Sequence, residues 1–196
     1  MSVAQIDPKA ALVLIDLQAG IVAMPTHPRS GADVVQSAVR LAAAFRNADR
    51  LVVLVHVTRA PDGSDAAPGR TDSPRPAFAP GSDALEAPIE PFGHVVVTKR
   101  NWGAFYGTDL DLQLRRRGIT QIVLAGIATS MGVESTARGA HERGYNVMTV
   151  VDVMADPSQE AHENSIQRIF PRISERAFAD DVIAALEGTS AADTSN

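Results

Sequence analysis

The chain has 196 residues, a length typical of a single domain, with 45% hydrophobic and 21% charged residues. Its formal net charge of -5 gives no electrostatic footprint for nucleic acid and disfavours an anionic membrane as a partner. The sequence contains no cysteine, which excludes a disulfide, a zinc–thiolate site and a thiol nucleophile. Since neither a secretion signal nor a membrane-spanning apolar run is recognisable, we expect a cytoplasmic location.

Along the chain, apolar runs alternate with segments of helical periodicity. The apolar runs predict strands at 11–15, 51–57, 94–98, 122–125 and 147–151, with a short sixth strand at 173–178. Helices are predicted at 32–48, 108–118, 133–143, 158–169 and 179–186. This alternation predicts an α/β, Rossmann-like three-layer fold with a mostly parallel sheet of about six strands between helices.

A single domain is expected over residues 1–187, followed by a polar tail at 188–196 that we expect to be disordered. Residues 58–87 are rich in Pro, Gly, Asp and Ser and show no periodic pattern. Irregular segments of about 30 residues inside a compact domain are usually functional, so this one is a candidate substrate loop. Arg59 and Arg70 in this loop could bind a substrate carboxylate, although solvated loop charges are the more frequent case.

The stretch from Gln121 to Asp152 has the pattern strand, turn, helix, strand, which predicts a βαβ unit with two parallel strands. Ligands of such units lie beyond the carboxyl ends of the strands, where a helix start presents backbone N–H groups. The turn at 126–132 is therefore where we expect chemistry. Two charged residues, Asp16 after ALVLI and Lys99 after HVVVT, end other strands at the same edge.

Three separated motifs resemble the isochorismatase-like hydrolase family, the cysteine-hydrolase superfamily. They are Asp16 and Gln18 after ALVLI, Lys99 with the following AF and Thr108, and GIATSMGVESTARGA at the central turn. The resemblance covers nearly the whole chain and implies the family's hydrolase fold. It implies that Asp16 is the catalytic aspartate, that Lys99 pairs with it, and that Gly132 stands where most members carry the nucleophilic cysteine.

Glycine at position 132 excludes amide cleavage through a thioester, because glycine has no side chain that could attack a carbonyl carbon. Isochorismatases proper, by resemblance, also carry glycine there and hydrolyse a vinyl ether without a covalent intermediate. That reaction needs a carboxylic acid to protonate the terminal carbon, and water to capture the oxocarbenium ion. Asp16 is the candidate acid. Lys99 would lower its pKa whereas burial would raise it, and the sequence leaves this balance open.

The resemblance also implies a non-proline cis peptide in the central turn, at Ile127–Ala128. We expect the backbone N–H groups of Ala128 and Gly132 to converge as an oxyanion hole. The alternative is a plain helix start in which the glycines of the turn only permit tight packing.

Four further residues are candidates for substrate binding: Gln18, Arg59, Trp102 and Phe105. The two aromatic residues, together with Tyr106, could instead pack at a subunit interface. No cofactor or metal is expected, because the segment after the second strand lacks the aspartate and histidines that metal-binding members place there, and the other histidines show no short ligand spacing.

The expected function is a hydrolase without a cysteine nucleophile that acts on a small anionic metabolite, such as isochorismate or another enol ether. Two alternatives stay open, because a tyrosine and a histidine of isochorismatases proper correspond to Ala128 and Ser130 here. Asp16 and Lys99 could activate water against another labile bond, or the chain could be a degenerate member that binds a small molecule or a partner. The resemblance also implies a homo-oligomer, a dimer or larger.

Overall fold

The computed structural model describes residues 5–60, 62–65, 69–72 and 79–193. Its centre is a sheet of six parallel strands in the order β3-β2-β1-β4-β5-β6. The strands are β1 (Ala10–Ile15), β2 (Leu51–Val57), β3 (Val95–Lys99), β4 (Gln121–Ile127), β5 (Asn146–Ala155) and β6 (Glu175–Ala177). The strand order reverses between β1 and β4, and α/β sheets bind ligands at the carboxyl ends of strands at such a reversal.

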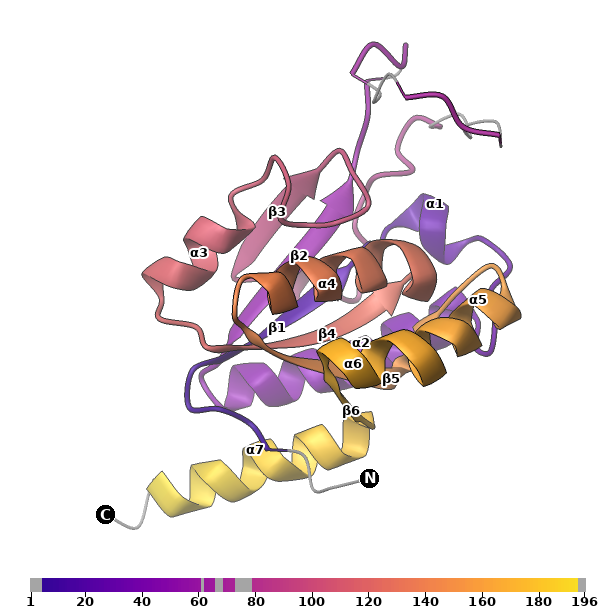
Figure 1. The fold of residues 1–196 in the computed structure, drawn as a ribbon. Coiled ribbons are helices and arrows are strands. Elements are labelled where there is room, and N and C mark those ends of the chain that lie inside the picture. Colours follow the sequence, from indigo (N-terminus) through magenta and orange to yellow (C-terminus); the bar gives the residue numbers. More distant parts are fainter. Residues whose placement is uncertain (1–4, 61, 66–68, 73–78, 194–196) are drawn as a thin grey trace.

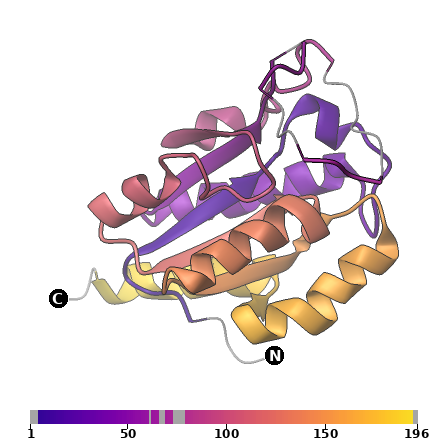
Figure 2. The same ribbon diagram turned by 45° about the horizontal axis from the view of Figure 1, so that its top comes forward.

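Helices cover both faces of the sheet and give three layers (Figures 1 and 2). One face carries α2 (Gly31–Asn47) and α7 (Ala179–Asp193), and the other carries α3 (Leu110–Arg116), α4 (Glu134–Glu142) and α6 (Phe170–Ile173). The remaining elements are α1 (Ala19–Val22), α5 (Gln159–Asn164), the 3-10 turn η1 (Glu90–Phe92) and the π-helical turns η2 (Thr129–Val133) and η3 (Ser165–Ile169). In the described part of the chain, no helix has the length and apolar character to cross a membrane.

The central strands are buried because both of their faces are covered. All residues of β1 and β4 are buried, and successive side chains of a strand point to opposite faces. Leu12 and Leu14 therefore belong to the core under α2 and α7, while Ala11 and Val13 belong to the core under α3 and α4. The α/β fold predicted from the continuous apolar runs is confirmed.

Two predicted boundaries near the carboxyl end of the chain are wrong. The helix after β5 continues through η3 and α6 to Ile173, so β6 spans only Glu175–Ala177. Pro171 lies in the first turn of α6, directly after the π-helical turn η3. Helix α7 continues to Asp193, so residues 188–193, predicted to be a disordered tail, are helical. The alanines near its end favour helix and extend a helix that is already packed on the sheet.

The predicted substrate loop at 58–87 contains no helix or strand in its described residues, and part of it (61, 66–68 and 73–78) lies outside them. Its second limb runs antiparallel to the start of α1. The N–H groups of Ala19 and Gly20 donate to the carbonyls of Ala84 (2.9 Å) and Ser82 (2.9 Å). The hydroxyl of Thr58 donates to the carboxylate of Asp83 (2.6 Å), which ties the first limb to the second. The base of the loop is therefore fixed beside the carboxyl end of β1.

Gly126, the second-last residue of β4, lets this strand pass close to β1. Its φ is +125°, and an added Cβ would lie 2.1 Å from the carbonyl oxygen of Ile15. We expect Gly126→Ala to lower the free energy of unfolding by about 3 kcal/mol or more, because backbone strain and overlap add. Urea unfolding would measure this loss.

Gly118→Ala is the control, since Gly118 also has a positive φ (+65°) but no neighbour within 4 Å of an added Cβ. It should lose about 1 to 2 kcal/mol, and equal losses in the two variants would contradict a contribution from the close approach of the strands.

Candidate active site

An aspartate and a lysine form a buried ion pair at the carboxyl edge of the sheet. Asp16 follows β1 directly, and its N–H donates to the carbonyl of Val55 (2.8 Å). Its backbone has a positive φ of 53°, a conformation that non-glycine residues rarely adopt outside turns and functional sites. Lys99 ends β3, and its Nζ lies 2.7 Å from Asp16 Oδ2. Both side chains are almost completely buried, with exposures of 2% for Lys99 and 6% for Asp16.

The central turn completes this site from β4. A Cβ added to Gly132 would lie 3.1 Å from Asp16 Oδ2 and 3.6 Å from the carbonyl oxygen of Trp102. The structure therefore brings Asp16, Lys99 and Gly132 together at the reversal of strand order. Position 132 faces the carboxylate directly, yet glycine places no reactive group there.

Burial decides the protonation of Asp16, the balance that the sequence leaves open. Desolvation raises the pKa of this carboxyl to about 6, although the charge of Lys99, its hydrogen bond and the more distant His56 all lower it. Asp16 Oδ1 is buried and accepts no hydrogen bond from the described residues. A second hydrogen bond of Lys99 Nζ, to the carbonyl of Asn101 (3.1 Å), holds the ammonium in place. The carboxyl can thus carry a proton near neutral pH and has one oxygen unengaged by the described chain.

Side chains that follow β5 hold the central turn in place. Asp156, fully buried, accepts hydrogen bonds through Oδ2 from the N–H (2.8 Å) and the hydroxyl (2.7 Å) of Ser130. The hydroxyl of Thr129 lies 2.8 Å from Nδ1 of His162, and burial lowers the pKa of that imidazole, which favours its neutral form. The Ile127–Ala128 peptide at the start of the turn is cis.

Two side chains that support the turn, Asp156 and His162, were not predicted from the sequence. Asp156 could have been found, because it follows an apolar strand just as Asp16 and Lys99 follow theirs. His162 gave no comparable signal, since it lies on a helix whose contact with the turn depends on tertiary packing. The convergence of the N–H groups of Ala128 and Gly132 stays a prediction. The carbonyl of Ala128 accepts hydrogen bonds from the N–H groups of Met131 (3.2 Å) and Val133 (3.2 Å).

The four predicted substrate-binding residues lie in different surroundings. Gln18 is fully buried, and its amide accepts from the N–H of Val57 (2.8 Å) and donates to the carbonyls of Val57 (2.9 Å) and Ser82 (3.2 Å). It therefore anchors the base of the loop at 58–87. Phe105 is buried in the core beside Tyr145, with ring centroids 6.0 Å apart, which gives it a packing role. Trp102 is 60% exposed, and Arg59 is half-buried just after β2.

His56 has hydrogen-bonding partners on both sides of its ring. Nδ1 lies 3.0 Å from the carbonyl of Asp83, and Nε2 lies 2.8 Å from the hydroxyl of Thr98. Because a carbonyl only accepts, Nδ1 carries a proton. His56 thus joins β2 and β3 to the loop. Among the described residues, no group of three or more His, Asp or Glu side chains could hold a metal ion.

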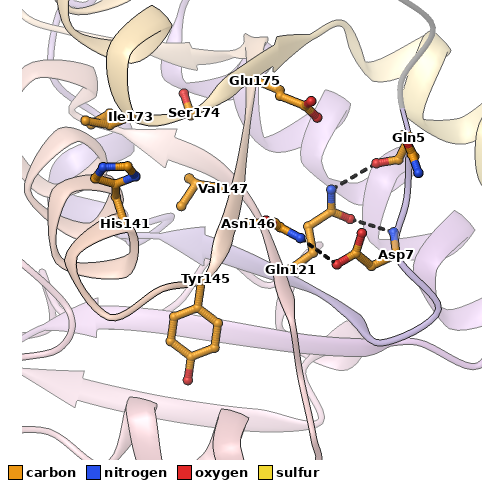
Figure 3. Close-up of a pocket in the computed structure, with 10 residues that line it drawn as sticks. All are labelled: Gln5, Asp7, Gln121, His141, Tyr145, Asn146, Val147, Ile173, Ser174 and Glu175. Carbon is orange, nitrogen blue, oxygen red and sulfur yellow. Dashed lines mark hydrogen bonds between the residues drawn. The ribbon is translucent and has the colours of Figure 1, made fainter.

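A separate pocket of about 360 Å³ lies at the opposite edge of the sheet, where β4 and β5 begin (Figure 3). Some of the polar groups that line it pair with one another. The Gln121 amide bonds the carbonyl of Gln5 (2.9 Å) and the N–H of Asp7 (2.9 Å), and the Asp7 carboxylate accepts from Asn146 (3.0 Å). These bonds fasten the segment before β1. Neither Asp16 nor Lys99 lines this pocket, so it is not part of the site.

Comparisons with known proteins agree with this geometry. Residues 10–179 match the model of the isochorismatase domain. The chain is 44% identical over 179 residues to the uncharacterized isochorismatase family protein YecD of Escherichia coli O157:H7, across 90% of this chain and 95% of that protein. An isochorismatase family protein from Burkholderia thailandensis is 49% identical in sequence, with a TM-score of 0.90 over 95% of this chain and 100% of that one. The nicotinamidase of Bacillus subtilis is similar at 25% identity, with a TM-score of 0.73 over 86% and 99% of the two chains.

Proposed function

Because the chain belongs to the isochorismatase family of hydrolases, we propose that it cleaves the enol ether bond of a small anionic metabolite, such as isochorismate. The observation that carries this proposal is the Asp16 carboxyl, whose pKa is raised to about 6 in a buried site that contains no nucleophile at position 132. A carboxyl of this kind can act as a general acid near neutral pH.

The reaction begins with transfer of the Asp16 proton to the terminal carbon of the enol ether. The carbon bearing the ether oxygen then becomes an oxocarbenium ion, and the negative Asp16 carboxylate left behind stabilises it. Water adds to this carbon, and the resulting hemiketal collapses to a ketone and an alcohol. Lys99 neutralises the carboxylate after the proton has left, because its ammonium is fixed 2.7 Å from Oδ2. In isochorismate the ketone product is pyruvate.

Amide hydrolysis, the activity that the name of the nicotinamidase states, fits this site less well. The cysteine route of such enzymes attacks the amide with a thiolate, and no cysteine occurs in this sequence. An added Cβ at Gly132 would also lie 2.9 Å from Ile15 Cγ2, so the space that a cysteine side chain would need is filled. This packing supports water, rather than a side chain, as the attacking group.

The test is pyruvate release from isochorismate, with nicotinamide as the control substrate. We expect turnover of isochorismate and none of nicotinamide. For isochorismate, kcat/KM should fall about tenfold per pH unit above pH 6. The sign follows from the acid role, since the active form is protonated, present below the pKa of about 6 and lost as the pH rises through it. In D2O, deuterium should appear in the methyl group of pyruvate. No turnover of isochorismate, or pyruvate without deuterium, would reject this reaction.

A second candidate is a hydrolase in which ionised Asp16 acts as a base and activates water against another labile bond. The same pKa of about 6 favours it, because most of this carboxyl is ionised at pH 7. The activity would then rise with pH through 6, the opposite of the acid profile. A degenerate member that binds without turnover would show neither profile. The cytoplasmic location expected from the sequence and the homo-oligomeric state implied by the family resemblance are part of what we propose for this protein.

A further inference from the structure

A pocket of about 260 Å³ lies where β1, β2 and β3 begin, at the edge of the sheet opposite the candidate active site. It is lined by residues 8–10 at the start of β1, residues 49–51 at the start of β2, His94 before β3, and Arg117 and Ile119 after α3. Three of these residues, Lys9, Arg50 and Arg117, are cations, and one, Asp49, is an acid. The pocket therefore has two positive charges in excess, in a chain whose net charge is -5.

Within the described part of the chain, the cations of this pocket have no carboxylate partner. The ion pairs found there use other residues, and none of them includes Lys9, Arg50 or Arg117. By contrast, Arg115 pairs with Asp111 on the same helix (3.5 Å). Cations that lie close together without a counter-ion repel one another, and an anion bound among them relieves this repulsion.

The two arginines are held in place by bonds that engage only one of their nitrogens. Arg50 Nη1 donates to the carbonyls of Asp7 (2.9 Å) and Pro8. Arg117 Nη1 donates to the carbonyl (2.9 Å) and the side-chain oxygen (2.7 Å) of Gln113. A guanidinium also carries N–H groups on Nε and Nη2, and these have no acceptor among the residues that the structure describes. Positioned guanidinium groups of this kind suit the paired oxygens of a phosphate or carboxylate.

His94 adds an uncharged donor to the same pocket. Its Nδ1 accepts a hydrogen bond from the N–H of Val52 (3.0 Å), so the proton of the neutral ring is on Nε2. Partial desolvation lowers the pKa of this imidazole, and the charges of Arg46 and Arg117 lower it further, against the opposite effect of Asp49. The ring is therefore neutral at pH 7, and its Nε2–H can donate to an anion.

The charge and the size of the pocket match a small dianion. A phosphate monoester carries about 1.5 to 2 negative charges at pH 7, close to the excess of positive charge, whereas a carboxylate carries a single one. The volume of about 260 Å³ is smaller than that of most pockets for drug-sized ligands. We propose that this pocket binds a small phosphate-bearing molecule, either inorganic phosphate or a short phosphate ester, through Lys9, Arg50 and Arg117.

A plain helix end is the alternative explanation for one of these cations. Arg117 follows α3, and its bond to the carbonyl of Gln113 offsets the negative end of that helix. This explanation does not extend to Lys9 and Arg50, which lie directly before β1 and β2. The experiment therefore changes Lys9 and Arg117 separately, and leaves Arg50, whose bonds fasten the segment before β1.

Calorimetric titration at pH 7 and constant ionic strength tests the proposal, with inorganic phosphate, glycerol phosphate and acetate as probes. The wild-type chain should bind both phosphates, and acetate at least about tenfold more weakly. Lys9→Gln and Arg117→Gln should each weaken phosphate binding at least about tenfold, the usual effect of removing a charged donor. Asp49→Asn should strengthen it about twofold or more, because it removes the acid of the pocket. Asparagine tolerates the positive φ of 53° at this position.

Arg116→Gln is the matched control. It removes the same charge from the neighbouring position of the chain but does not line the pocket, so the wild-type affinity should be kept. Proton NMR locates the bound ion, since phosphate should move the ring signals of His94 and not those of His162 beside the central turn. Tighter binding of glycerol phosphate would identify an ester as the ligand, and tighter binding of inorganic phosphate would identify the free ion.

Three results would overturn the proposal. The first is that neither phosphate binds saturably to the wild-type chain. The second is an unchanged phosphate affinity in folded Lys9→Gln and Arg117→Gln, with circular dichroism as the check on folding. The third is binding of acetate as tight as that of phosphate, which would contradict a site for a dianion. None of these measurements depends on the reaction proposed for Asp16.

Discussion

Asp16→Asn is expected to lower kcat for enol ether cleavage by about 10² to 10⁴-fold, the usual contribution of a general acid. The amide that replaces the carboxyl has nearly the same shape and can still accept the hydrogen bond from Lys99 Nζ. It has no acidic proton to give to carbon. The affinity for a product should therefore change little, which isothermal titration with pyruvate and the alcohol product would measure beside the turnover.

Two further variants test whether Asp16 itself supplies the proton. Asp83→Asn is the control, because Asp83 is a carboxylate that holds the base of the nearby loop and does not contact Lys99. It should retain activity close to that of the wild type. Lys99→Met removes the charge that lowers the pKa of Asp16, so the fall in activity should move to a pH above 6. If Asp16→Asn turns over substrate at the wild-type rate, Asp16 is not the acid.

The sheet could be predicted from the sequence because its strands are buried on both faces. A strand such as β1 consists of apolar residues throughout, and the chain between strands shows helical spacing. The ends of elements were harder to predict, because they depend on packing and not on periodicity. The helix at 158–173 continues across Pro171, and α7 continues past residue 187, where no hydrophobic pattern marks the end.

The site could be predicted in part, for a related physical reason. Parallel strands bring their carboxyl ends to one edge, so polar residues that follow apolar runs are expected to meet, as Asp16 and Lys99 do. Side chains whose role depends on a turn or a loop give no such signal. Gln18 was expected to face the substrate, but its amide bonds the backbone of Val57 and Ser82 instead. Nor could the pKa of Asp16 be predicted, because it depends on how completely the fold buries the carboxyl.

Gly132→Cys is expected to abolish enol ether cleavage without creating an amidase. The new Cβ would lie 2.9 Å from Ile15 Cγ2, and this β-branched methyl group belongs to a buried strand and has little freedom to move. We expect a loss of about 1 to 3 kcal/mol in the free energy of unfolding, the usual effect of overpacking. Because the added Cβ would also lie 3.1 Å from Asp16 Oδ2, the thiol would occupy space beside the acid, and kcat should fall at least about 10²-fold.

A double-mutant cycle tests whether crowding against Ile15 causes the loss of stability. Ile15→Ala removes the methyl group that meets the new Cβ, so Gly132→Cys/Ile15→Ala should lose less stability than the two single variants predict together, by about 1 to 3 kcal/mol. Gly103→Ala is the nearby control, because its added Cβ finds its nearest neighbours at 3.5 Å, an ordinary contact. Additive losses in the cycle would show that contact with Ile15 is not the cause of the lost stability. Nicotinamide hydrolysis by Gly132→Cys would show that the site can still accommodate a nucleophile. If the double variant loses less stability than the sum of the single variants and no amide is cleaved, the packing of Ile15 against the turn is the reason that position 132 requires glycine.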